Sequence, residues 1–208
     1  AGATILAGQE ADELLVEDDA VIGVRTGSGD LMADNVIVAA GIDLPQVLAT
    51  IGLDLAMNNE AGMLARTTAG DAMIDTILVA KDVHVWRRDD GGYLIGADFG
   101  GGEEPDDAEE QATRVLADLQ RLLSGTDACS IENVTVRERP MPRDGRPAIG
   151  PFGPKGLYLV STHSGMTLAP VVSECVAAEI GSGAPDPRLA PYRPDRPALR
   201  PMGPTLDV

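Results

Sequence analysis

The chain has 208 residues, of which 44% are hydrophobic and 24% are charged. This composition is typical of globular domains, so extensive disorder is excluded. Acidic residues outnumber basic ones by 33 to 16, a formal net charge of −17. Phosphate backbones and anionic lipid surfaces repel such a chain, so neither nucleic acid nor a membrane is expected as a partner.

Cysteine and histidine are scarce: the chain contains Cys129, Cys175, His84 and His163. Two cysteines make no disulfide framework, and no metal centre is expected because zinc and iron–sulfur sites need three or four clustered ligands. A reducing compartment fits this cysteine content. Because we find neither a signal peptide nor an apolar run that spans a membrane, the sequence predicts a cytoplasmic location.

The first third of the chain predicts a hairpin and a buried strand. Residues 21–26 and 31–40 are rich in Val and Ile and flank the turn sequence Gly-Ser-Gly-Asp, which indicates two paired strands. Residues 36–40, VIVAA, are continuously apolar, as in a strand buried on both faces. The character of the sequence changes from Leu44 onward, and we place a domain crossing near residue 45.

The middle of the chain predicts strands and one helix. Candidate strands lie at residues 63–68 and 77–79, and residues 83–87 and 93–96 flank Asp-Asp-Gly-Gly, which predicts a hairpin. Residues 109–123 carry a helical apolar stripe that ends in Ser-Gly. Residues 131–139 alternate as a strand does, and a turn at 142–146 leads to residues 148–150.

The last third predicts a strand, a short turn and a helix. Residues 156–161 are typical of a buried strand, and a helix is predicted over 168–180, with Pro170 in its first turn and Gly181 at its end. This helix carries apolar and small residues on all its sides, so most of its surface is expected to be buried. Residues 185–208 form a proline-rich tail.

Two features could carry chemistry. The turn Thr162-His163-Ser164-Gly165 precedes the predicted helix, whose first N–H groups can receive an anionic or electron-rich atom. The alternative is a plain strand-to-helix connection. Ser164 has no acidic partner in view, so we do not predict a hydrolase.

The second feature is a cluster of arginines within ten positions: Arg137, Arg139, Arg143 and Arg146. Strand alternation places Arg137 and Arg139 on one face, and a guanidinium matches a carboxylate with two hydrogen bonds. The alternative is that these arginines pair with the surplus acids on a solvated surface.

Three segments also carry a family resemblance: VIVAAG at residues 36–41, RPMPRDGRPAIGP at 139–151 and GLYLVSTHSGMTLAPVVSECVAAEI at 156–180. Together they resemble the D-amino-acid oxidase-like family of FAD-dependent oxidoreductases, which includes glycine and sarcosine oxidases. The opening strand, GxGxxG turn and helix with which such enzymes hold the FAD pyrophosphate are not in this sequence. The chain therefore looks like a C-terminal portion.

The resemblance implies an α/β (α+β) fold in two parts. A partial Rossmann-like FAD-binding domain would comprise residues 1–45 and 150–184. A substrate-binding domain with a mixed, largely antiparallel sheet would comprise residues 46–149, and the tail would follow from residue 185.

The resemblance also implies a cofactor site. The backbone of Ala11 would meet the adenine, and Ala39, Ala40 and Gly41 would pass close to the dinucleotide. The residues beside the pyrimidine edge of the flavin ring would be His163, Ser164, Gly165, Met166 and Thr167. There the helix dipole would stabilise the negative charge that the ring gains on reduction.

On the substrate side, Arg139 matches the position at which amino-acid-oxidising relatives hold the substrate carboxylate. Trp86 and Tyr93 are further candidates for the substrate pocket, although a buried ribbon would use them equally well. Family members with covalent FAD carry a cysteine just after Arg139, and here Pro140 and Met141 follow, so non-covalent FAD is expected. No catalytic residue is assigned.

The function implied is oxidation of an amine or amino acid, of the D-amino acid, glycine or sarcosine type, by hydride transfer to the flavin. The missing FAD-binding segment, or a second chain that carries it, would be the partner. One alternative is a non-catalytic subunit or fragment that completes the site of a separate dinucleotide-binding chain. Another is an interaction domain that has kept the fold and lost the chemistry.

Overall fold

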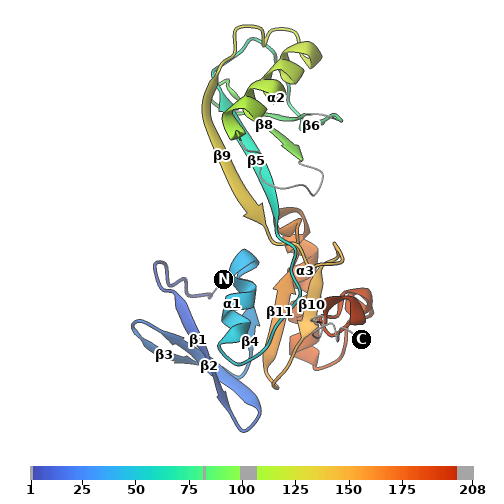
Figure 1. The fold of residues 1–208 in the computed structure, drawn as a ribbon. Coiled ribbons are helices and arrows are strands. Elements are labelled where there is room, and N and C mark those ends of the chain that lie inside the picture. Colours follow the sequence, from blue (N-terminus) through green and yellow to red (C-terminus); the bar gives the residue numbers. More distant parts are fainter. Residues whose placement is uncertain (1, 82, 99–106, 201–208) are drawn as a thin grey trace, which may run out of the picture. The chain divides into compact units, whose positions relative to one another are not determined.

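The computed structural model describes residues 2–81, 83–98 and 107–200 (Figure 1). The chain forms two compact units, one of residues 1–59 with 140–208 and the other of residues 60–139. The sequence placed the domain crossings near residues 45 and 149. Helices are mixed with sheets that are largely antiparallel, which confirms the predicted fold class.

The first unit contains two small sheets. Strands β1 (Ala11–Glu17), β2 (Ala20–Thr26) and β3 (Gly29–Met32) form an antiparallel meander. Strands β10 (Ala148–Pro151), β11 (Leu157–Ser161) and β4 (Val36–Val38) form the second sheet in that order, with β4 parallel to β11.

The hairpin of β2 and β3 confirms the predicted turn at residues 27–30, but the single strand predicted over 31–40 is wrong. The chain changes sheets between Met32 and Val36. The N–H of Ala33 still donates to the Ile22 carbonyl in the first sheet, whereas the N–H of Val36 donates to the Gly156 carbonyl beside the second.

Helices pack on both faces of the β10-β11-β4 sheet. Helix α1 (Leu44–Ala49), which the sequence did not predict, follows the 3-10 turn η1 (Gly41–Asp43), and its core residues pack with those on one face of the sheet. The other face packs against α3 (Gly165–Ser182). The shared core residues are Leu44, Leu48, Val36, Val38, Leu157 and Leu159 on the first face, and Ile149, Tyr158, Cys175 and Val176 on the second.

Helix α3 differs from its prediction in extent and in burial. It begins at Gly165, three residues early, so Pro170 lies inside the helix, and it ends at Ser182 before the left-handed Gly183. Among the described residues only one side of α3 meets the sheet, and its buried residues are Cys175, Val176 and Glu179. The expected burial of most of its surface is therefore wrong.

Strand β4 is also less buried than predicted. Val36 and Val38 are buried, but Ile37 between them is 48% exposed, so the strand is covered on one face only. In the part of the chain that the structure describes, no helix combines the length and apolarity needed to cross a membrane.

The second unit is one antiparallel sheet with a helix on one face (Figure 1). The strand order is β6-β7-β8-β5-β9, and α2 (Ala108–Leu122) packs on β5, β8 and β9. The strands are β5 (Glu60–Thr67), β6 (Leu78–Val79), β7 (His84–Arg87), β8 (Tyr93–Asp98) and β9 (Ile131–Arg139). The predicted hairpin of β7 and β8 and the predicted helix are confirmed.

The two faces of this sheet carry different side chains. The face toward α2 holds the core, in which Met63, Ala65, Val85, Tyr93 and Ile95 pack with Ala112, Val115 and Leu119. The opposite face, which we call the open face, carries the alternate residues of the same strands. Its members include Gly62, Leu64, Trp86, Leu94, Gly96, Arg137 and Arg139.

The described part of the proline-rich tail is ordered against the first unit. It contains the short turns η2 (Pro187–Tyr192) and η3 (Pro197–Leu199), and Leu189 and Leu199 are buried. The guanidinium of Arg143 donates hydrogen bonds to the carbonyls of Ala198 and Arg200. The rest of the predicted tail, residues 201–208, lies outside the described residues.

Candidate substrate and cofactor sites

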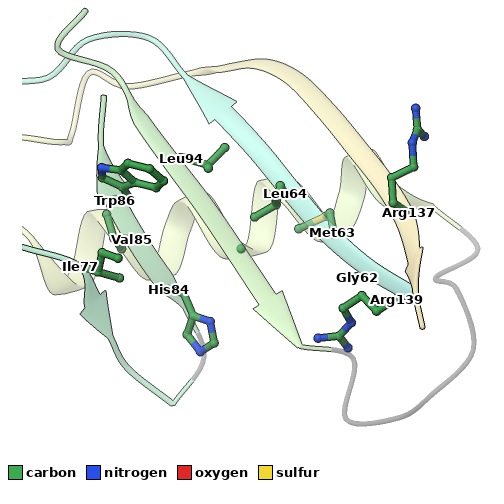
Figure 2. A pocket seen from close by; sticks show the side chains of 11 residues that line it. Gly62, Met63, Leu64, Ile77, His84, Val85, Trp86, Leu94, Arg137 and Arg139 are labelled. Carbon is green, nitrogen blue, oxygen red and sulfur yellow. The ribbon is translucent and has the colours of Figure 1, made fainter. Parts of the chain in front are cut away.

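Each unit has an apolar groove of its own. The sheet-face groove of the second unit has a volume of about 340 Å³ and lies on the open face. Figure 2 shows Trp86, Leu94 and Leu64 projecting from three different strands on this face. The groove is lined by Gly62, Met63, Leu64, Ile77, His84, Val85, Trp86, Leu94, Gly96, Arg137 and Arg139.

Arg139 lies across the strand next to its own at one end of this groove. Its Nη2 is 3.6 Å from Oε2 of Glu60 and donates to the Ala61 carbonyl at 3.3 Å. A Cβ built on Gly62 would be 3.1 Å from Nε of Arg139 and 3.2 Å from its Cδ. The missing side chain at Gly62 therefore gives the arginine room to lie over β5 (Figure 2).

The four arginines of the predicted cluster separate. Arg137 and Arg139 share the open face while Val136 packs toward the core, which confirms the predicted alternation. Figure 2 shows Arg137 pointing away from the other labelled side chains. Arg143 and Arg146 belong to the other unit, in the turn before β10.

The two aromatic candidates lie on opposite faces of the sheet. Trp86 is 55% exposed and lines the groove. Tyr93 is 0% exposed, packs in the core beneath α2, and its hydroxyl donates to the Ala72 carbonyl at 2.7 Å. Burial raises the pKa of the Tyr93 phenol because it disfavours the charged form. Tyr93 therefore does not line the sheet-face groove.

The second groove, which we call the helix-side groove, lies in the first unit among β4, β11 and α3 and has a volume of about 490 Å³. Its lining is small and apolar apart from three hydroxyl side chains. The lining residues are Ile37, Ala39, Gly41, Pro140, Val160, Ser161, Thr162, Gly165, Ala169, Val172, Ser173, Val176 and Ala177. Ser161 is 2% exposed, and its Oγ has no hydrogen-bond partner among the described residues.

The turn before α3 presents the predicted cofactor residues to solvent. His163, Ser164, Gly165, Met166 and Thr167 are exposed, Met166 to 95%. Nδ1 of His163 lies 3.2 Å from Oγ of Ser164, and Ser164 makes no side-chain cap to the helix. The first N–H groups of an 18-residue helix therefore meet solvent, where an electron-rich atom would be favoured.

The remaining predicted cofactor residues are dispersed over the first unit. Gly41 and Gly165 line the helix-side groove together. Ala40 is half-buried just before Gly41, and the exposed Ala11 begins β1, opposite Thr26. Neither Ala11 nor Ala40 lines this groove.

Several lining residues were not anticipated from the sequence. They are mainly Leu64, Leu94, Gly62 and Gly96 in the sheet-face groove, and Ile37, Ser161 and Val172 in the helix-side groove. Alternation within a strand was visible, but the pairing of β5 with β8 and β9 was not. Within residues 2–81, 83–98 and 107–200, no cluster of three or more His, Cys, Asp or Glu could hold a metal ion.

Two comparisons of sequence place this chain among known proteins. Residues 1–179 match the family model described as FAD dependent oxidoreductase (DAO). The chain is 27% identical over 183 residues to a glycine oxidase of Pseudomonas putida and 28% identical over 194 residues to one of Pseudomonas aeruginosa. Each alignment covers 86% of this chain and 50% of the relative, so the chain spans about half the length of these proteins.

Solved structures share the fold at lower sequence identity. A glycine oxidase from Geobacillus kaustophilus matches with a TM-score of 0.72 at 20% identity, over 94% of this chain and 53% of that one. An L-proline dehydrogenase from P. horikoshii matches with a TM-score of 0.78 at 19% identity, over 93% and 55%. The family match over residues 1–179 confirms the resemblance drawn from the three motifs: this chain belongs to the family of FAD-dependent oxidoreductases.

Proposed function

We propose that this chain is the substrate-binding and partly flavin-binding portion of an enzyme that oxidises an amine or amino acid. Family membership supports a flavin-dependent oxidoreductase, and its relatives include glycine oxidases. The observation that carries the proposal is the sheet-face groove, which combines an arginine at one end with apolar walls. Such a groove suits a small molecule with a carboxylate at one end.

Arg139 would bind the substrate carboxylate. A guanidinium and a carboxylate form a planar, two-bonded pair that fixes orientation as well as position. The Glu60 contact of 3.6 Å is longer than a charge-assisted hydrogen bond of about 2.8 Å. A carboxylate held at one end of the groove fixes the direction in which the C–H bond of the substrate points.

The helix-side groove and the turn before α3 would hold part of the cofactor. The unpartnered Oγ of Ser161 and the exposed helix N-terminus supply polar contacts in an otherwise apolar lining. The residues proposed to contact it are Ala11, Ala40, Gly41, His163, Ser164, Gly165, Met166 and Thr167. Bound FAD would accept the hydride from the substrate C–H bond. Pro140 and Met141 follow Arg139 where a cysteine linkage would stand, which favours non-covalent binding.

We expect that this chain alone neither holds FAD tightly nor turns over substrate. One side of α3 and the Ile37 face of β4 are exposed, so the helix-side groove lacks a wall among the described residues. The flavin absorbance of the purified chain measures this. Stable stoichiometric flavin in the isolated chain would contradict the expectation.

The test of the substrate role is the pair Arg139→Ala and Arg139→Lys, made in the protein that carries both this chain and its FAD-binding segment. Truncation of a charge partner should lower kcat/KM for an amine that carries a carboxylate at least about 30-fold. Lysine should restore part of this loss because it keeps the charge and loses the planar fork. Arg114→Ala, on an exposed part of α2, is the matched control.

Oxidation of an amine without a carboxylate provides the internal comparison. Its kcat/KM should be unchanged by Arg139→Ala, because no anion is held there. Equal losses with both kinds of amine, or no loss with either, would remove Arg139 from the substrate site.

A second candidate function is a non-catalytic subunit that completes the site of a separate dinucleotide-binding chain. The exposed apolar side of α3 favours it, since a helix that is apolar all round is normally covered on every side. Co-purification with a chain that carries GxGxxG would support this candidate. Val171→Glu, on the exposed side of α3, should abolish that association without unfolding the chain.

A further inference from the structure

The open face of the second unit is more apolar than a solvated sheet face usually is. Leu64 is 49% exposed, Trp86 is 55% exposed and Ile77 is 61% exposed, and all three line the sheet-face groove with Leu94. Antiparallel sheets with one face in water normally place polar residues on that face. A contiguous exposed apolar patch therefore marks a binding surface.

Two glycines open the centre of this face. In the strand register Gly96 lies opposite both His84 and Leu64. A Cβ on Gly96 would come within 2.9 Å of Cδ2 of Leu64 and 3.1 Å of the Met63 carbonyl oxygen, so a larger residue would push Leu64 out of place. The groove of about 340 Å³ therefore depends on the absence of a side chain here.

The residues of the groove follow each other in rows along the sheet. Arg139 lies over Gly62 at one end. The row of Leu64, Gly96 and His84 comes next, and the row of Arg66, Leu94 and Trp86 follows. Successive rows of one face are two residues apart, roughly 7 Å. A molecule with its carboxylate at Arg139 would thus extend its other end over Leu64 and toward Trp86.

We infer that the substrate is an amino acid with a large apolar side chain, which the groove prefers over glycine. This inference rests on the proposed function, because it assigns the apolar rows to the substrate that Arg139 would anchor. Glycine would leave the surfaces of Leu64, Leu94 and Trp86 in water, whereas a longer side chain would cover them. Each methylene that is buried should improve binding roughly fourfold.

The first test measures kcat/KM in the complete protein, with this chain and its FAD-binding segment. The substrates are glycine and both enantiomers of alanine, norvaline and norleucine. For one enantiomeric series, kcat/KM should rise with the length of the substrate side chain, and kcat/KM for norleucine should exceed that for glycine at least about 50-fold. If glycine is the best of these substrates, the inference is overturned and the proposed function stands. If no amino acid is oxidised but an amine without a carboxylate is, the inference and the role of Arg139 are overturned; if neither is oxidised, the proposed function fails as well.

Inhibition by unreactive carboxylates tests the same groove in the unaltered protein. The inhibition constants of acetate, butyrate and hexanoate should fall roughly fourfold per methylene. Inhibition that is equally weak for all three would overturn the inference.

Two matched variants locate the effect. Trp86→Ala should lower kcat/KM for norleucine about tenfold and leave glycine within about twofold. Leu122→Ala removes an apolar side chain of similar exposure from α2 on the other side of the sheet, and both substrates should be unaffected. Equal losses for glycine and norleucine in the Trp86 variant would speak against contact with the substrate side chain.

Discussion

At the scale of single residues, Gly62 acts as a positioning residue for Arg139. In Gly62→Ala the added Cβ would come within 3.1 Å of Nε of Arg139, so the arginine side chain would have to shift away from β5. We expect KM for a carboxylated amine to rise about tenfold or more, since small displacements of an orienting group are costly. Steady-state kinetics of the complete protein, with KM and kcat separated, measure the effect.

The control for this prediction is Gly181→Ala in α3. A Cβ at Gly181 would meet nothing within 4 Å, so the same chemical change displaces no neighbour. This variant should leave KM unchanged. A Gly62 variant with normal KM would show that the guanidinium does not depend on the space above Gly62.

Glu179 forms an ion pair with Arg193 at the buried side of α3. Its carboxylate is buried on α3 and faces Arg193, with Oε1 2.9 Å from Nη1 and Oε2 accepting from Nη2 at 3.0 Å. Glu179→Ala leaves the arginine without its partner charge and should lower the free energy of unfolding by about 3–5 kcal/mol. Urea denaturation measures this loss.

The exposed pair of Glu174 and Arg188 provides the comparison. Glu174→Ala should change the free energy of unfolding by less than about 1 kcal/mol, because solvent screens this pair. If the two variants lowered the free energy of unfolding equally, burial would not determine how much an ion pair stabilises this chain.

How far the sequence could predict single residues depended on which face of a strand turns inward. The alternation of β9 placed Arg137 and Arg139 correctly on one face because the charged and apolar residues of that strand differ clearly. In β8 the run Tyr93-Leu94-Ile95 is apolar at every position, so periodicity carried no information about the face. The packing of α2 on the sheet decides that Tyr93 is buried and Leu94 is not.

At the scale of elements, local signals fixed one helix better than the other. The apolar stripe and the Ser-Gly end predicted α2 to within one residue, and Asp107 caps it by accepting from the N–H groups of Glu109 and Glu110. Residues 165–167 carry no such stripe, so the start of α3 was placed late. Pro170 marked a first turn in the sequence, yet the helix accommodates it six residues in, where only one N–H is lost.

The turn before β10 is tied to the tail by an ion pair that responds to pH. Asp144 accepts from Nε of Arg196 at 2.8 Å and from Nη2 at 2.7 Å, and these hydrogen bonds hold the pKa of Asp144 below its ordinary value of 3.8. The depressed pKa means that the pair stabilises the fold fully above pH 3.8. That stabilisation is lost as the pH falls through the lower, folded-state pKa.

We therefore expect Asp144→Asn to lower the free energy of unfolding by about 2 kcal/mol at pH 6. The difference from the parent protein should shrink as the pH falls below about 4, because the parent then loses the same interaction. Urea titrations at several pH values give the two curves. A difference that stays constant between pH 6 and pH 2 would contradict this account.

At the scale of the whole molecule, the grooves depend on pairings between distant segments. The run at residues 31–40 divides between two sheets because its backbone partners come from residues 20–26 and from residues 156–159. No periodicity within ten residues contains that information. The family motifs predicted the fold class. They did not predict that β4 and α3 are each exposed on one side, because that depends on which other elements pack against them.

The two cysteines allow each unit to be followed separately. Cys129 is buried in the second unit and Cys175 in the first, both are free thiols, and burial raises the pKa of each. A thiol reagent needs the thiolate and access to it, so modification should await local opening. We expect Glu179→Ala to speed labelling of Cys175 and to leave Cys129 slow.

Tyr93→Phe should speed labelling of Cys129 and leave Cys175 slow. It removes the hydroxyl that donates to the Ala72 carbonyl in the core of the second unit. Mass spectrometry of the cysteine-containing peptides after timed labelling reports both rates in one sample. If each variant sped the labelling of both cysteines equally, the units would open as one.

The chain leaves the first unit and returns to it at adjacent points. Met57 forms a bridge with Pro142, the N–H of Asn58 donates to the Met141 carbonyl at 2.7 Å, and Glu60 lies opposite Arg139 in the next pair of strands. The two segments that connect the units are therefore paired with each other through their backbones. Replacement of the second unit as a block, as by recombination, would therefore exchange its groove and leave the strand pairings of the first unit unchanged.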